Sequence, residues 1–89
     1  MATKEQNLEF LNNALSTMNQ LATNPSTPKN IRKNIRYLND GLKAGEYSVS
    51  VRALNTISSL DDMTQYPNLP SYVRTSLWQA VSTLEGIRE

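Results

Sequence analysis

The chain contains neither cysteine nor histidine. Without cysteine it cannot form disulfides, thiolate metal sites or a cysteine nucleophile. Without histidine it lacks the commonest general base and the commonest metal ligand, so acid–base chemistry would depend on carboxylates, lysine or tyrosine alone. We therefore expect a protein that is not an enzyme, with no catalytic residue, no metal, no cofactor and no small-molecule substrate.

The sequence also lacks a long apolar run and a large excess of charge. No stretch approaches the roughly 18 consecutive apolar residues of a membrane span, and the first residues contain no apolar run typical of a signal peptide. Nine basic and eight acidic residues give a formal net charge of +1, which does not indicate a strongly basic nucleic-acid binder. We expect a cytoplasmic protein without membrane contact, in which residues 1–89 form a single domain.

The sequence consists of two similar halves. A pattern of two prolines and an arginine occurs twice, 42 residues apart: Pro25, Pro28 and Arg32, then Pro67, Pro70 and Arg74. Apolar positions keep the same offset, as Ile35 and Leu77 do. A fixed internal period indicates a repeated supersecondary unit. We predict that each unit is a helix, a proline-bounded turn and a second helix.

Apolar residues at alternating spacings of three and four predict four helices. The first is expected from about Thr3 to Thr23, where Thr3 and Gln6 form the pattern of a capping box. The third is expected to follow Ser48, whose hydroxyl can accept a hydrogen bond from the first turn, and to end before the break at Tyr66. No alternating apolar and polar run predicts a strand.

Prolines mark the start of the other two helices. Thr27 is expected to cap the second helix, with Pro28 at its first position, where the missing N–H costs nothing. Pro70 is expected to start the fourth helix in the same way. The second helix should end near Lys43, followed by Gly45 as a left-handed cap or a loop residue.

Four helices with one apolar stripe each, joined by short turns, can bury those stripes only against one another. The expected fold is all-α: a four-helix up-and-down bundle made of two pseudo-repeated helical hairpins. The alternative is a two-unit hairpin stack of the HEAT type, in which proline is followed by a β-branched residue and arginine. We favour the bundle, because a solenoid usually needs about three repeats or more.

Three parts of the chain, residues 27–32, 50–53 and 67–85, form a distinctive combination. Together they resemble a group of small archaeal proteins, the uncharacterised protein family 0147. The resemblance covers nearly the whole chain. It implies a four-helix bundle of about this length and an archaeal cytoplasmic source, and it supplies no activity. The family more often has Val-Pro-Arg at the first turn, where this chain has Thr27-Pro28-Lys29, which retains the proline and the positive charge.

The second predicted helix carries a basic face, formed by Lys29, Arg32, Lys33 and Arg36. Spacings of three, four and seven place these side chains on one side of a helix. Such a face can contact RNA phosphates, with Tyr37 as a nearby stacking residue, or an acidic partner protein. The alternative is a solvated face that aids solubility, which is the usual role of charge runs on helices.

Aromatic residues surround the second proline turn: Tyr66, Tyr72 and Trp78. Tyrosine and tryptophan often anchor protein interfaces, so these residues are candidates for contact with a partner or with a second copy of the chain. Half-buried packing is the alternative, because Trp78 lies one position from the apolar stripe of its helix.

Arginines and acids form two further sets. Arg32, Arg52 and Arg74 have planar guanidinium groups that can tie helix starts to turn carbonyls or to carboxylates, and we favour this structural role over a partner surface. Asp61 and Asp62 are adjacent, so on a helix they point about 100° apart and do not converge on one metal or proton. A solvated pair is expected.

These features favour a non-enzymatic protein-interaction module that binds a partner protein or itself. The alternative is an RNA- or ribosome-associated accessory protein that binds through the basic face. A third hypothesis, a hydrolase or metal enzyme, would need a polar pocket between the helices. The apolar stripes supply no buried acid or base to line one.

Overall fold

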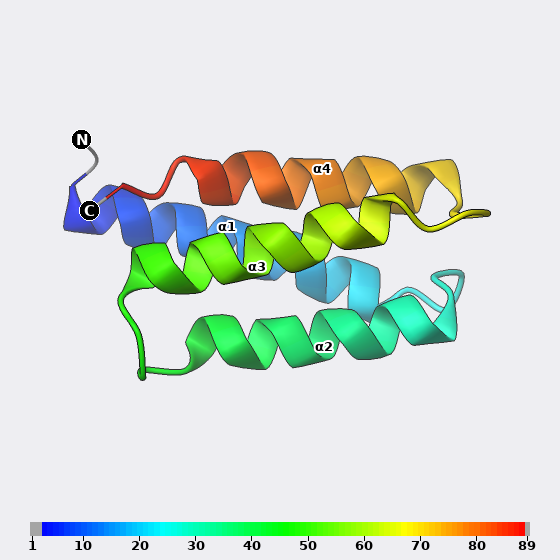
Figure 1. The fold of residues 1–89 in the computed structure, drawn as a ribbon, viewed down its shortest axis with the longest axis horizontal. Coiled ribbons are helices and arrows are strands. Elements are labelled where there is room, and N and C mark those ends of the chain that lie inside the picture. The colour runs from blue at the N-terminus through cyan, green and yellow to red at the C-terminus, as the bar shows by residue number, and fades with distance from the viewer. Residues whose placement is uncertain (1–2, 89) are drawn as a thin grey trace.

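The structure is a computed structural model that describes residues 3–88, and it contains four helices and no strand within them. The helices are α1 (Lys4–Thr23), α2 (Lys29–Lys43), α3 (Val49–Thr64) and α4 (Ser71–Glu85). Consecutive helices run in opposite directions, and the long axis of the molecule measures 37 Å (Figure 1). None of these helices is long and apolar enough to cross a membrane.

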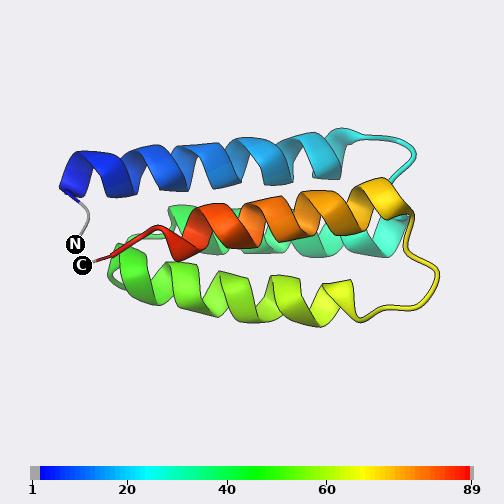
Figure 2. The same cartoon turned by 90° about the horizontal axis from the view of Figure 1, so that it is seen from above.

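The four helices form a ring. α1 packs against α2 and α4, and α3 packs against the same two helices, with the least extensive contact between α2 and α3 (Figure 2). A HEAT-type stack would instead pack α1 against α3 and α2 against α4. The predicted four-helix up-and-down bundle is therefore confirmed.

The repeat is visible in the helix bounds and in the core. α4 begins and ends 42 residues after α2, and both proline turns lie at the same end of the bundle (Figure 1). Equivalent core residues of the two halves are all buried: Ile31 and Val73, Ile35 and Leu77, Leu42 and Leu84, Met18 and Leu60. The two hairpins thus use the same apolar positions.

The predicted caps of α1 and α3 are confirmed. The Thr3 hydroxyl accepts a hydrogen bond from the Gln6 backbone N–H at 3.1 Å, and the Gln6 side chain accepts one from the Thr3 N–H at 2.9 Å. The Ser48 hydroxyl accepts from the Val51 N–H at 3.3 Å. Both caps satisfy N–H groups that have no partner inside the helix.

The predicted starts of α2 and α4 are wrong by one residue. Pro28 and Pro70 are the cap residues themselves, with extended ψ angles of 142° and 144°. The Thr27 side chain therefore does not cap α2, and it is buried between the turns instead. Gly45 is a loop residue without a positive φ. A left-handed residue is not needed there, because Ala44 ends α2 in an extended conformation.

A polar clamp joins the two ends of the described chain. The Asn7 side chain donates to the Arg88 carbonyl at 2.8 Å and accepts from the Arg88 N–H at 3.0 Å. Asn7 is buried, although it is polar and lies in the first turns of α1. The pair of hydrogen bonds fixes the segment after α4 against α1.

We predict that Asn7→Ala lowers the free energy of unfolding by about 1 to 3 kcal/mol, because both backbone groups of Arg88 lose their partner. Asn12→Ala is the matched control, since Asn12 is exposed on the same helix. Asn12→Ala should not lower the free energy of unfolding, because alanine favours the helix. Urea denaturation followed by circular dichroism measures both variants, and equal stabilities would contradict the clamp.

Candidate functional site

The basic face lies on the outside of α2, and one of its members, Arg36, reaches α1. Lys29, Lys33 and Arg36 are exposed, and Arg32 is half-buried. The Arg36 guanidinium donates to the Ala22 carbonyl at 3.4 Å, near the C-terminal end of α1. The structure thus brings the four predicted residues together, and one of them also contacts the neighbouring helix.

Arg52 and Arg74 bind backbone carbonyls at the ends of the preceding helices. Arg52 Nη1 donates to the Leu42 carbonyl at 2.7 Å, and Arg74 Nε donates to the Thr64 carbonyl at 3.3 Å, in each case ten residues back. The last carbonyls of a helix have no intrahelical partner and carry partial negative charge. These arginines therefore stabilise the turns, as the structural interpretation predicts. The Nε atoms of Arg32 and Arg52 are both buried without a hydrogen-bond partner.

The predicted aromatic interface residues do not share one surface. Tyr66 lines a hollow between α2 and α3. Trp78 lines a hollow between α4 and α1, on the opposite side of the ring. Tyr72 begins α4, and its hydroxyl lies 3.2 Å from the Thr27 hydroxyl of the first turn. This hydrogen bond links the two proline turns.

We predict that Tyr72→Phe destabilises the fold by about 0.5 to 1.5 kcal/mol, because it leaves the hydroxyl of Thr27 buried without this hydrogen bond. Tyr66→Phe is the matched control: the two tyrosines are 39% and 37% exposed. It should change stability by less than about 0.5 kcal/mol. Thermal denaturation distinguishes the two, and an equal loss in both variants would argue against the link.

The acidic pair lies in the last turns of α3. Asp61 and Asp62 are both exposed, and only Asp62 lines a hollow. Within residues 3–88 no three acidic side chains gather in a way that could hold a metal ion.

Two adjoining hollows follow the contact between α2 and α3, and we call them together the α2–α3 groove. Their volumes are about 540 and 240 Å³, and they share Tyr37, Leu38 and Ser59. From α2 and the following turn the groove also includes Asn34, Asp40, Gly41, Ala44, Glu46 and Tyr47. From α3 and its end it includes Arg52, Asn55, Thr56, Asp62, Met63 and Tyr66.

Three tyrosines border this groove with exposed rings. Tyr37 is 78% exposed, Tyr47 is 60% exposed and Tyr66 is 37% exposed. The floor is apolar or weakly polar, with Leu38 half-buried and Thr56 and Met63 buried. The groove was not predicted from the sequence, where its signal was two tyrosines, Tyr37 and Tyr47, on either side of the turn between the second and third helices.

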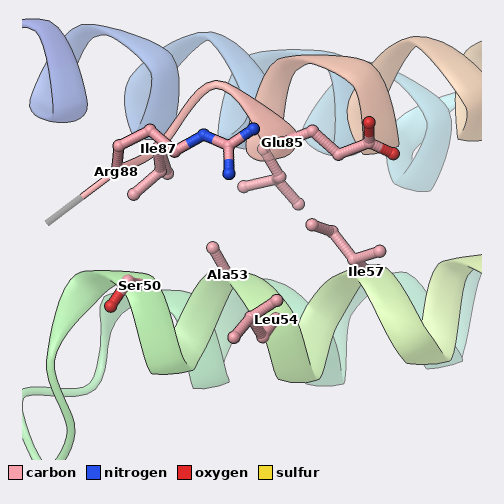
Figure 3. Close-up of a pocket in the computed structure, with 8 residues that line it drawn as sticks. Ser50, Ala53, Leu54, Ile57, Glu85, Ile87 and Arg88 are labelled. Carbon is pink, nitrogen blue, oxygen red and sulfur yellow. The ribbon is translucent and has the colours of Figure 1, made fainter. Parts of the chain in front are cut away.

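A separate hollow of about 630 Å³ lies between α3 and the end of α4 (Figure 3). Ala53, Leu54 and Ile57 face it from α3. Glu85 and Arg88 extend along its other wall (Figure 3). The lining of this hollow is mainly apolar, and its polar members are Ser50, Glu85 and Arg88.

The fold defines a class of protein: a small antiparallel four-helix bundle in which α2 and α3 make the least extensive contact. The chain belongs to the uncharacterised protein family UPF0147, whose model matches residues 1–87. This finding confirms the resemblance found in the sequence.

Relatives and solved structures agree with this assignment. The UPF0147 protein of Metallosphaera sedula is 36% identical over the full length of both chains. The UPF0147 protein of Aeropyrum pernix is 36% identical over 85% of this chain and 84% of its own. The crystal structure of a UPF0147 protein from Thermoplasma acidophilum matches with a TM-score of 0.88 and 27% identity, covering 94% of this chain and 99% of that one. A second crystal structure, of the unknown-function protein MMP1188, has a TM-score of 0.89 and 32% identity over 99% of this chain and 100% of that one.

Proposed function

We propose that the chain is a cytoplasmic, non-enzymatic protein-interaction module that binds a partner protein through the α2–α3 groove. The observation that carries this proposal is the row of exposed tyrosines along the least closely packed seam of the bundle. Tyrosine is enriched at interfaces, because its ring supplies a large contact area while its hydroxyl tolerates water.

The groove has the shape that a helix recognises. Its two walls are antiparallel helices, and its floor reaches the half-buried Leu38 and the buried Met63. Apolar side chains of a partner helix could pack between the walls, as in other helix-in-groove complexes. Extended-strand addition is a poor alternative, since residues 3–88 contain no strand whose edge could pair.

The test is recovery of a partner from native lysate that has been treated with nuclease. The double variant Tyr37→Ala with Tyr47→Ala should recover at least tenfold less of any stoichiometric partner, because both ring contacts are lost. Trp78→Ala is the control, since Trp78 is 54% exposed at the opposite seam. Circular dichroism checks that all variants fold.

Two results would count against this function. One is a partner that the double tyrosine variant retains and Trp78→Ala loses, which would move the binding surface to the α1–α4 seam. The other is a partner that disappears on nuclease treatment of the unmodified protein.

RNA binding is the second candidate function. It is favoured by the exposure of Lys29 and Lys33 beside Tyr37, which offers phosphate contacts and a stacking ring together. Arg36 is less suitable for a test, because its reversal would also remove the hydrogen bond to Ala22.

If RNA binds here, Lys29→Glu with Lys33→Glu should weaken the binding of single-stranded RNA and flatten its salt dependence. Loss of two phosphate contacts lowers the slope of log K against log salt by about 1.4. Lys4→Glu is the single-charge control at the far end of α1. Filter binding across a salt series measures the slopes, and an unchanged slope in the double variant would exclude the basic face.

A further inference from the structure

We infer that the occupant of the α2–α3 groove is an amphipathic helix that carries lysine or arginine beside its apolar face. This inference rests on the proposed function and adds the chemistry of the partner. Three observations support it. They are the charges of the groove, the absence of these charges from the equivalent α4–α1 seam, and the length of the groove walls.

Carboxylates outnumber cations among the charged residues that line the groove. Asp40, Glu46 and Asp62 line it, and Arg52 is the one cation among its described lining residues. Arg52 is half-buried, and its Nη1 is engaged with the Leu42 carbonyl at 2.7 Å. The groove therefore presents more negative than positive charge to a partner.

The negative groove belongs to a chain with a formal net charge of +1. The cations of α2 are not among the residues that line the groove, and Arg36 donates to the Ala22 carbonyl of α1. A preference for a cationic partner would be a property of the groove and would not follow from the overall charge of the protein.

The internal repeat offers a comparison for this seam. Exchange of the two halves places the α2–α3 seam on the α4–α1 seam, because equivalent residues lie 42 positions apart. Tyr37 then corresponds to Gln79, and Asp40 corresponds to Ser82, and both equivalents line the hollow between α4 and α1. The Tyr37 ring and the Asp40 carboxylate are therefore absent from the equivalent positions of the α4–α1 seam, where the aromatic residue is Trp78, at the position equivalent to Arg36.

The length of the walls sets the size of the occupant. Along α3, the lining runs from Arg52 to Met63. At 1.5 Å per residue this stretch is roughly 17 Å long, or about three helical turns. A partner helix of this length would place two or three apolar side chains in the groove. Lysine or arginine at the flanking positions would reach Asp40 at one wall and Asp62 near the other end.

The test uses two fluorescein-labelled synthetic helical peptides that have leucine at the same positions. All remaining positions are lysine in one peptide and glutamate in the other. Fluorescence anisotropy should show at least tenfold tighter binding of the lysine peptide at moderate salt. Amide chemical shifts of the full chain should change along α2 and α3 when that peptide binds. Equal binding of both peptides, tighter binding of the glutamate peptide, or no binding of either would overturn the inference.

Matched variants separate the groove from overall charge. Asp40→Asn with Asp62→Asn should reduce the preference for the lysine peptide to threefold or less. Glu9→Gln with Asp61→Asn removes the same charge from exposed carboxylates that do not line the groove, and it should leave the preference intact. An equal reduction in both double variants would show nonspecific attraction and overturn the inference.

The same variants distinguish this inference from the proposed function. If the tyrosine variants lose the native partner while Asp40→Asn with Asp62→Asn retains it fully, the groove binds a partner without a cationic helix. If the tyrosine variants retain the native partner, the groove itself is not the binding surface. Loss of the partner in both sets supports both proposals.

Discussion

Each helix of this chain has a single apolar stripe, and the stripe can leave water only when the four helices close into a ring. The repeat meets this requirement with the same positions in both halves, so that Ile31 and Val73 are each fully buried. In the closed ring, the apolar stripes pack against one another in the core. Binding is therefore left to the outer faces and to the seams between helices, and this is where the tyrosines and most charged side chains lie.

Polar contacts at the ends of the bundle are the second requirement of this architecture. Arg52 and Arg74 satisfy carbonyls at helix ends, and Thr27 and Tyr72 join the two proline turns. These side chains hold the fold, so their exposure does not by itself indicate a partner. This distinction matters for Tyr72, which looks like an interface residue in the sequence but has a structural contact in the fold.

Helix positions were predictable from the sequence to within about one residue, because periodicity, prolines and capping hydroxyls act locally. The exceptions arise from tertiary contacts. The Thr27 hydroxyl is recruited by Tyr72 from the other turn, and Asn7 meets the backbone of Arg88, which is 81 residues away. The aromatic cluster was not predictable as a surface, because neighbours in the sequence lie at different seams of the ring. The groove was missed for the same reason.

The open seam itself has a cause in side-chain size. At the α4–α1 seam the repeat places Ala14 and Ala80, both fully buried, whereas the equivalent residues of the other half are Thr56 and Leu38. Small residues let two helices approach closely, and larger ones hold them apart. The Asn7 clamp further secures α1 against the segment that follows α4. The α4–α1 seam is thus more closely packed, while the α2–α3 seam leaves a groove with a half-buried leucine at its base. A helix that fills this groove would bury Leu38 as its equivalent Ala80 is already buried.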